Sequence, residues 1–247
     1  LIDLNSYSAM AIQYSRGCPF NCEFCDSIEI YGRKPRTKSP EQVIAEVEQL
    51  RQRDWRGAVF IVDDNFIGNK VKVKEMLPHL AEWNNSLRHP FTFYTEASLN
   101  LADDADLLQM MQDAHFTRVF LGIETPDEES LKEAQKLQNT RRSLLESVQR
   151  IQRYGMEVMA GFIVGFDSDP ENIFDPQVEF IQESAIPMAM VGLLCALPNT
   201  QLYRRLEREG RLIESHSGDN MDLRLNFVPK MNPQKLIDGY RSILKRI

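Results

Sequence analysis

The chain has 247 residues, 43% of them hydrophobic and 26% charged, which is typical of a globular protein with one sizeable core. Its formal net charge of -7 argues against a general nucleic-acid-binding protein, so we expect no nucleic-acid partner. No apolar run approaches the roughly 18 residues of a transmembrane helix, and no secretory signal pattern is visible.

Short runs rich in β-branched and aromatic residues alternate with helical patterns along the chain. The first helix is predicted to begin at Ser39-Pro40-Glu41-Gln42, which combines an N-cap serine, a proline at the first helical position and a glutamine three residues after the cap. Thr125-Pro126 and Asp169-Pro170 predict two further helix starts, and Gly210 predicts a helix end. The predicted strands are 10–15, 58–62, 91–95, 118–123, 158–164 and 188–194.

Strands that alternate with helices favour an α/β fold with parallel pairing and right-handed crossovers. A complete TIM barrel has eight strand-helix units, whereas this sequence predicts six. We therefore expect a partial, TIM-like (β/α)6 barrel of parallel strands over residues 1–213, followed by a C-terminal helical extension over 214–247. A doubly wound sheet is the alternative, because a sequence does not fix the order of its strands.

Polar residues follow the predicted strands at their carboxyl ends, the edge at which such folds bind ligands. The most informative are Cys18, Cys22 and Cys25, which have the spacing C-x3-C-x2-C and follow the first strand. At any single position a helix cap or a turn explains a polar residue equally well, but all six strands end in this way. The others are Asp63, Asp64, Asn65, Thr95, Glu96, Glu124, Gly165, Asp167, Pro198 and Asn199.

Three thiolates can bind three irons of a [4Fe-4S] cluster and leave the fourth iron open to a substrate or cofactor. A zinc site is the alternative, although zinc usually has four cysteine or histidine ligands. No further ligand lies near the triplet in the sequence, so the fold would have to supply Cys195, His79 or His115. Cys195 lies in the apolar run 191–197, where we expect a small core residue. Clustered cysteines also differ from a disulfide framework, so we expect a reducing, cytoplasmic compartment.

The segment Cys18 to Cys25, with the aromatic Phe24 before its last cysteine, resembles the signature of the radical S-adenosylmethionine (radical SAM) superfamily. The resemblance covers essentially the whole chain. It is closest to the cobalamin-dependent subgroup, and within it to the hopanoid C-2 methylases and their relatives. The further motifs that carry it are Val62-Asp63-Asp64-Asn65-Phe66, Thr95-Glu96-Ala97-Ser98, Gly122-Ile123-Glu124, Gly161 to Phe166 and Ala196 to Tyr203.

The resemblance implies a role for each of these motifs. Cys18, Cys22 and Cys25 would ligate a [4Fe-4S] cluster, and the amino and carboxylate groups of SAM would chelate the open iron. One electron from the cluster would then cleave the sulfonium and release a 5′-deoxyadenosyl radical. The cofactor-binding residues that the resemblance predicts are Phe24, Asp63, Asp64, Glu96, Glu124, Arg141, Gly161 and Gly165.

Some of these residues have specific implied contacts with SAM. Asp63 and Asp64 would contact the amino group, and the Glu124 carboxylate would accept hydrogen bonds from two ribose hydroxyls. The segment from Gly161 to Gly165 would let the backbone approach the adenine. Arg141 would pair with the SAM carboxylate.

In the subgroup, cobalamin carries the methyl group and a separate upstream domain holds the corrin. The chain contains no Asp-x-His-x-x-Gly motif, so we expect the catalytic barrel alone, without that cobalamin-binding domain. The resemblance implies methylation of an unactivated carbon in an apolar or lipid-like, hopanoid-type small molecule, with flavodoxin or ferredoxin as electron donor. Two alternatives stay open: a radical SAM oxidoreductase or cyclase, and a non-catalytic iron-sulfur or zinc-binding module.

Overall fold

The structure is a computed structural model that describes residues 4–140, 142–213 and 223–247. Its main sheet has six parallel strands in the order β1-β4-β5-β6-β7-β8, which is also their order along the chain. A doubly wound sheet reverses its strand order at a switch point, so this order confirms the partial barrel and removes the alternative. The strands are β1 (Ala9–Ile12), β4 (Ala58–Ile61), β5 (Phe93–Ala97), β6 (Phe116–Glu124), β7 (Glu157–Val164) and β8 (Met188–Leu193).

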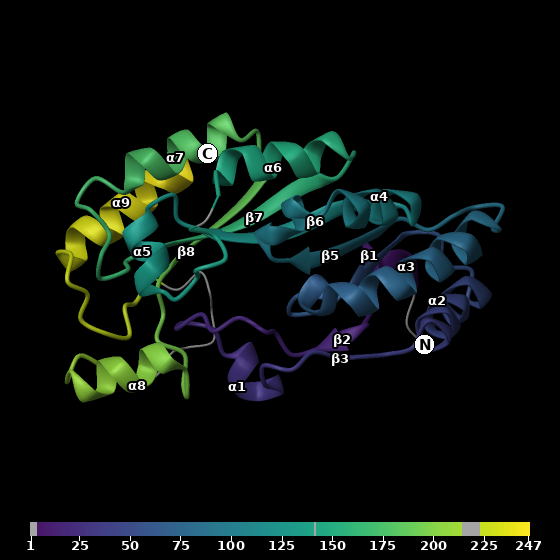
Figure 1. Cartoon of the computed structure of the whole chain (residues 1–247). Helices are drawn as coiled ribbons and strands as arrows, with labels where there is room; N and C mark the ends of the chain where they lie inside the picture. The colour runs from purple at the N-terminus through teal and green to yellow at the C-terminus, as the bar shows by residue number, and fades with distance from the viewer. Residues whose placement is uncertain (1–3, 141, 214–222) are drawn as a thin grey trace.

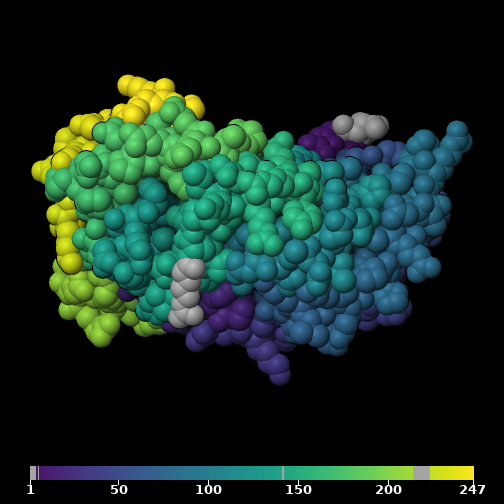
Figure 2. Space-filling view, turned by 45° about the horizontal axis from the view of Figure 1, so that its top comes forward, coloured from purple at the N-terminus to yellow at the C-terminus, as the bar shows by residue number. Residues whose placement is uncertain are grey.

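Most helices pack against the outer face of this sheet, while α1 and α8 lie together on its other side (Figure 1). In both Figure 1 and Figure 2, α2 and α3 lie at one end of the molecule and α8 and α9 at the other. The helices are α1 (Ser27–Tyr31), α2 (Pro40–Gln52), α3 (Lys70–Asn85), α4 (Ala105–Asp113), α5 (Glu128–Glu133), α6 (Leu144–Arg153), α7 (Phe174–Glu183), α8 (Gln201–Arg208) and α9 (Pro233–Arg246). In the described part of the chain, short 3-10 helices span Leu4–Ser6, Phe66–Asn69 and Leu99–Asp103.

The two faces of the sheet differ in burial because successive side chains of a strand point to opposite sides. In β6, Val119, Leu121 and Ile123 are fully buried beneath the helices. Arg118 and Phe120 alternate with them and lie on the other, inner face, where they are only partly buried. The main core therefore lies between sheet and helices, and the inner face is left to form cavities.

The predicted helix starts are confirmed in one case and shifted in two. Ser39 and Gln42 form the capping box that the sequence predicts for α2. α5 begins at Glu128, later than Thr125-Pro126 indicates, because the Asp127 carboxylate caps it by accepting from the Ser130 N–H at 2.8 Å. α7 begins at Phe174 and not at Asp169-Pro170, where the predicted start is wrong.

Most strand boundaries differ from the prediction by one to three residues, and in two cases a side chain takes over the backbone hydrogen bonds. β1 ends at Ile12, and beyond Gln13 the N–H groups of Tyr14 and Ser15 both donate to the Asp63 carboxylate at 2.8 Å. Ser15–Arg16 then forms β2, which pairs antiparallel with β3 (Arg36–Thr37). β5 begins at Phe93 because Asn84 bonds both the N–H and the carbonyl of Phe91, at 2.8 and 2.9 Å.

The last segments of the chain combine confirmed and untested predictions. Gly210 follows α8 with a φ of 67°, as the predicted helix end requires. α9 is the amphipathic helix predicted near the C-terminus. The predicted division at 213/214 falls at residues outside those described and stays a prediction. Within the described residues, no helix is both long and apolar enough to cross a membrane.

Candidate active site

The three clustered cysteines lie on a loop between β2 and α1, here called the cysteine loop (residues 17–26). The loop begins at Gly17, whose φ is 97° and whose added β-carbon would lie 2.8 Å from the Gly32 carbonyl oxygen. The Cys18 N–H donates to that same carbonyl at 3.3 Å. Only glycine therefore fits this close approach, which turns the chain toward the carboxyl edge of the sheet.

The thiols meet hydrogen-bond donors from two other parts of the fold. Asn65, after β4, donates to Cys18 Sγ at 3.7 Å, and Gln138, after α5, donates to Cys22 Sγ at 3.7 Å. Burial raises the pKa of the Cys18 and Cys25 thiols, and the neighbouring Cys22 raises both further. Such N–H donors suit thiolate ligands, because outer-shell hydrogen bonds tune a bound metal group.

A polar cavity of about 230 Å³ opens in front of these thiols. It brings together seven of the residues that the sequence predicts: Cys18, Cys22, Cys25, Phe24, Asp64, Glu96 and Glu124. These residues come from the cysteine loop and from the ends of β4, β5 and β6, so the predicted gathering of polar groups at one edge is observed. The rest of its lining consists of Phe20, Ser27, Asn65, Ala97, Ser98, Phe120, Gly122, Lys136 and Gln138.

The structure places three predicted residues, Asp63, Gly161 and Gly165, outside the polar cavity. Asp63 is buried below the cavity, where both carboxylate oxygens accept hydrogen bonds from Tyr14 and Ser15. Gly161 lines a neighbouring cavity, and Gly165, with a φ of 109°, forms the turn after β7. Arg141 lies outside the described residues. The predicted contacts of these residues with SAM stay predictions.

Glu124 and Lys136 form a buried ion pair at the end of β6, with side chains 8% and 10% exposed. Burial by itself lowers the pKa of the Lys136 ammonium, but its interactions with the Glu124 carboxylate, first of all, and with the nearby cysteines outweigh burial and raise that pKa. A β-carbon at Gly122 would collide with both members of the pair. Glycine at position 122 is therefore what leaves room for two charges beside the thiols.

The sequence reasoning missed Lys136. A signal was available, because Lys136 follows a helix whose spaced apolar residues, Leu131 and Ala134, become buried. A lysine so close to a buried face needs a carboxylate partner. The partner, Glu124, lies 12 residues away along the chain and could not be paired with it without the fold.

Glu96 supplies further negative charge to the polar cavity. Burial raises the pKa of this carboxyl, and the negative charges of Asp64 and Asp63 add to the effect. A cationic group that entered the cavity would relieve this repulsion. The cavity therefore combines a carboxylate-rich side with the Lys136 ammonium, a distribution suited to a ligand that carries charges of both signs.

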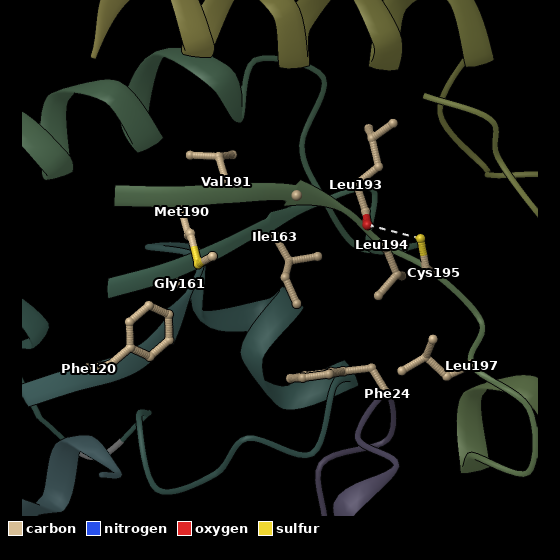
Figure 3. A pocket seen from close by; sticks show the side chains of 11 residues that line it. Phe24, Phe120, Gly161, Ile163, Met190, Val191, Leu193, Leu194, Cys195 and Leu197 are labelled. Atoms are coloured by element: carbon tan, nitrogen blue, oxygen red, sulfur yellow. Dashed lines mark hydrogen bonds between the residues drawn. The ribbon is translucent and has the colours of Figure 1, made fainter. Parts of the chain in front are cut away.

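An apolar cavity of about 250 Å³ lies next to the polar one and shares two of its walls, Phe24 and Phe120. Figure 3 shows these two rings on one side of it, facing Ile163 of β7 and Met190 of β8. Lys136 Nζ lies 5.8 Å from the centre of the Phe24 ring. The remaining lining is Gly161, Val191, Gly192, Leu193, Leu194, Cys195 and Leu197.

Two of these lining positions bear on the sequence predictions. Cys195 is only partly buried and lines the apolar cavity, so the prediction of a core residue is wrong. Its thiol follows the end of β8 and donates to the Leu193 carbonyl at 3.4 Å. A β-carbon at Gly161 would press on the Phe120 ring at 3.1 Å. At Gly192 an added β-carbon meets nothing within 4 Å, so this position faces open space.

The cysteine triad fits a cluster better than a single metal ion. Among the described residues, no three His, Cys, Asp or Glu side chains converge as ligands of one ion. In a [4Fe-4S] cluster the cysteines bind different irons, so their sulfurs stand apart around it. Tetrahedral zinc needs a fourth ligand, and the candidate Cys195 lines the apolar cavity instead.

Two family profiles match different parts of the chain. The profile of the radical SAM superfamily matches residues 12–181. The chain belongs to the radical SAM superfamily. A second profile, DUF4070, a domain of unknown function, matches residues 200–247. The resemblance inferred from the cysteine motif is thus confirmed at the level of the superfamily.

Two curated relatives have high sequence identity to this radical SAM chain. An uncharacterised methyltransferase of Synechocystis sp. is 49% identical over 241 residues, which are 97% of this chain and 45% of the relative. The hopanoid C-2 methylase of Rhodopseudomonas palustris is 42% identical over 228 residues, which are 92% of this chain and 43% of the relative. The chain therefore spans less than half the length of these relatives.

Solved structures support the fold. The radical SAM methyltransferase TsrM from Kitasatospora setae, solved with cobalamin and a [4Fe-4S] cluster, superposes with a TM-score of 0.75 at 14% identity, over 97% of this chain and 48% of TsrM. The cobalamin-dependent radical enzyme OxsB gives a TM-score of 0.70 at 15% identity, over 95% of this chain and 40% of OxsB. At such low identity the agreement concerns the partial barrel and not the ligands.

Proposed function

We propose that this chain is the catalytic core of a radical SAM methyltransferase that acts on an unactivated carbon of an apolar, lipid-like molecule. The observation that carries the proposal is the pair of adjoining cavities. One contains the cysteine triad and buried charges, the other has an apolar lining, and Phe24 and Phe120 belong to both. The 42% identity to a hopanoid C-2 methylase supports the reaction class and the lipid-like substrate.

In this proposal Cys18, Cys22 and Cys25 hold a [4Fe-4S] cluster at the polar cavity. When bound there, the cluster and SAM together supply a carbon-centred radical that can remove a hydrogen atom from an unactivated C–H bond. The residues of the chain hold the reactants in place and keep water away. Asn65 and Gln138 hydrogen-bond the sulfurs, and the bulk of Phe24 separates the charged site from the apolar one.

The charges of the polar cavity suit the parts of SAM. Lys136 is the one Lys or Arg side chain among the described residues that line the polar cavity, and its ammonium would pair with the SAM carboxylate. Asp64 and Glu96 lie on the same wall and would accept hydrogen bonds from its amino group. Glu124, held by Lys136, would accept the ribose hydroxyls. These four side chains would thus offer each polar part of SAM a partner of opposite charge or a hydrogen-bond acceptor.

The apolar cavity would receive the carbon that is methylated. Its lining contains no charged side chain, and it is open at Gly192. A cavity of this kind takes hydrocarbon more favourably than water. For the methyl carrier we propose cobalamin, bound by a domain outside this chain; the length of the relatives supports a further domain, but no described residue is assigned to the corrin.

Anaerobic reconstitution of the chain with iron and sulfide, followed by metal analysis and a reductant-dependent assay for 5′-deoxyadenosine, tests this proposal. We expect about four irons per chain, as a single cluster requires, and 5′-deoxyadenosine that forms only when SAM and reductant are both present. A protein that takes up zinc in preference to iron and never cleaves SAM would overturn the proposal in favour of a metal-binding module.

A further inference from the structure

Helix α8 reaches the cysteine loop from a part of the chain that lies outside the radical SAM match. α8 spans Gln201–Arg208, within the region matched by DUF4070. Figure 1 shows it beside α1, on the opposite side of the sheet from α6 and α7. Arg204 of α8 donates to Glu29 of α1 at 2.8 Å, in agreement with this placement.

The strongest contact between α8 and the cysteine loop is a two-pronged ion pair. Arg205 Nε donates to Glu23 Oε1 at 2.6 Å, and Arg205 Nη2 donates to Glu23 Oε2 at 3.2 Å. Glu23 stands between Cys22 and Phe24, and its side chain is only 10% exposed. Two parallel bonds between a guanidinium and a carboxylate fix both distance and orientation.

The backbone of Glu23 is held as firmly as its side chain. Its N–H donates to the Ala134 carbonyl at 2.9 Å, and its carbonyl accepts from the Leu202 N–H of α8 at 2.9 Å. The described cysteine loop has no helix or strand of its own between residues 17 and 26. Its shape therefore depends on such contacts from other elements.

A triangle of side-chain amides makes a second connection between α8 and the loop. Asn21 donates to Gln135 at 2.6 Å, Gln135 donates to Gln201 at 3.2 Å, and Gln201 donates back to Asn21 at 3.0 Å. Asn21 directly precedes Cys22 in the sequence. The residues on both sides of Cys22 are thus bound to α8.

Arg205 also connects the loop to the turn after β7. Its Nη1 donates to Asp167 Oδ2 at 2.8 Å, and Arg211 donates to both oxygens of Asp167 at 2.6 and 2.7 Å. The Asp167 side chain is 4% exposed, so the network is largely shielded from water. Asp167 follows Gly165, which ends the segment implied to approach adenine.

We propose that Arg205 is a positioning residue for the cysteine triad. It orients Glu23, and through Glu23 the backbone that carries Cys22 and Cys25, and it aligns this loop with the turn after β7. The segment 200–247 is on this view part of the cluster site. The inference rests on the proposed function, because it assumes that the triad binds a cluster.

Substitutions at position 205, with a control on the same helix, test this role. Arg205→Ala is expected to lose iron to a chelator about 10-fold faster than wild type, as for the loss of other outer-shell partners. Its reduced cluster should give a broadened electron paramagnetic resonance (EPR) spectrum, which Arg205→Lys partly restores. Arg208→Ala is the control, because the Arg208 side chain bonds only to the Arg204 carbonyl among the contacts described for it. It should behave as wild type.

A double variant separates positioning from stability. In Arg205→Met with Glu23→Gln the arginine and its Glu23 partner are both neutralised, and Asp167 keeps its two hydrogen bonds from Arg211. Glu133, which Arg205 also contacts at 3.3 Å, still accepts from the Asp167 N–H. The apo-protein should therefore regain part of its melting temperature. Because the two-pronged contact is still missing, we expect the EPR spectrum to remain broadened. This variant also keeps the test valid if Arg205→Ala does not fold.

The outcomes distinguish the inference from the function on which it rests. Iron retention and an EPR spectrum equal to wild type, in Arg205→Ala or in the double variant, would overturn the positioning role and leave the cluster assignment intact. Wild-type protein that binds no cluster under the same conditions would overturn the proposed function, and the positioning role with it.

Discussion

The polar and the apolar cavity share the side chains of Phe24 and Phe120 but differ in almost everything else. The polar cavity contains three thiols, three carboxylates and one ammonium, whereas no charged side chain lines the apolar one in the part of the chain described. Buried charges are costly unless they are paired or hydrogen-bonded, and a ligand that carries charges of both signs would supply further partners here. This difference supports our proposal that a charged cofactor binds in the polar cavity and a hydrocarbon in the apolar one.

The largest expected effect comes from removing a thiol of the polar cavity. One of the three cluster ligands is lost in each of the variants Cys18→Ala, Cys22→Ala and Cys25→Ala. The rate of 5′-deoxyadenosine formation should therefore fall by at least ~100-fold, which is more than the loss of an outer-shell partner causes. Cys195→Ala is a matched control, because its thiol lines the apolar cavity. Iron analysis and the assay for 5′-deoxyadenosine check this. A Cys195→Ala variant as inactive as the others would break the distinction between the two cavities.

The next effect concerns the ammonium of the polar cavity. Lys136→Met should raise the Kd for SAM by about 10- to 100-fold, as for the loss of a charged hydrogen bond. Lys132→Met is the control, because Lys132 lies nearby on α5 and pairs with the exposed Glu128 and Glu129. Equilibrium binding of SAM to the reconstituted protein measures the difference. Equal affinities for the two variants would mean that Lys136 serves only to hold Glu124.

The apolar cavity can be filled without touching the polar one. Gly192→Leu projects into open space, so the cluster and SAM affinity should persist while binding of an apolar fluorescent probe, anilinonaphthalene sulfonate, weakens about tenfold. Met188→Leu, on the same strand but 54% exposed, is the control. If Gly192→Leu instead weakens the binding of SAM and leaves the binding of the probe unchanged, the apolar cavity binds SAM and not the substrate.

The last prediction concerns stability and not binding, and involves Asp169, which supports the wall between the cavities. Its Oδ2 accepts from the Gly165 and Phe166 N–H groups at 2.7 and 3.0 Å, and Phe166 packs 6.1 Å from the Phe24 ring. Burial, partly opposed by these hydrogen bonds, raises the pKa of this carboxyl from 3.8 to about 6. The folded state therefore binds this proton more tightly than the unfolded state does.

This shift predicts a particular pH dependence of stability. The contribution of Asp169 to the free energy of unfolding should fall by roughly 1–3 kcal/mol as the pH rises from about 4 to 6. Above that range it should stay constant. Asp169→Asn resembles the protonated form and lacks this change. Urea unfolding of both apo-proteins at several pH values gives the difference. If the difference in unfolding free energy between wild type and Asp169→Asn does not widen as the pH rises, the pKa of Asp169 is not raised.

The sequence predicted the features that depend on local pattern. All six strands of the main sheet were located, because buried parallel strands read as short apolar runs, and the capping box of α2 was found from four consecutive residues. The cysteine spacing and the polar strand ends were equally local. Their meeting at one cavity followed from topology alone, since parallel strands end at the same edge.

The sequence could not predict contacts that join distant parts of the chain. Glu23 and Arg205 are 182 residues apart, and α8 reads only as an amphipathic helix. Asp63 illustrates the converse: the motif suggested a ligand of SAM, but the carboxylate accepts hydrogen bonds from Tyr14 and Ser15 just after the first strand. Which of two adjacent aspartates lines a cavity depends on how the strand ends, and one residue reverses the direction of the side chain.

The most direct test of the central claim is EPR spectroscopy of the reconstituted, reduced chain with and without SAM. The account predicts a signal from a reduced [4Fe-4S] cluster whose g-values change when SAM is added, because SAM binds at the iron that the three cysteines leave open. It also predicts that Lys136→Met requires more SAM for the same change. A cluster signal that SAM leaves unaltered at saturating concentration would contradict the account.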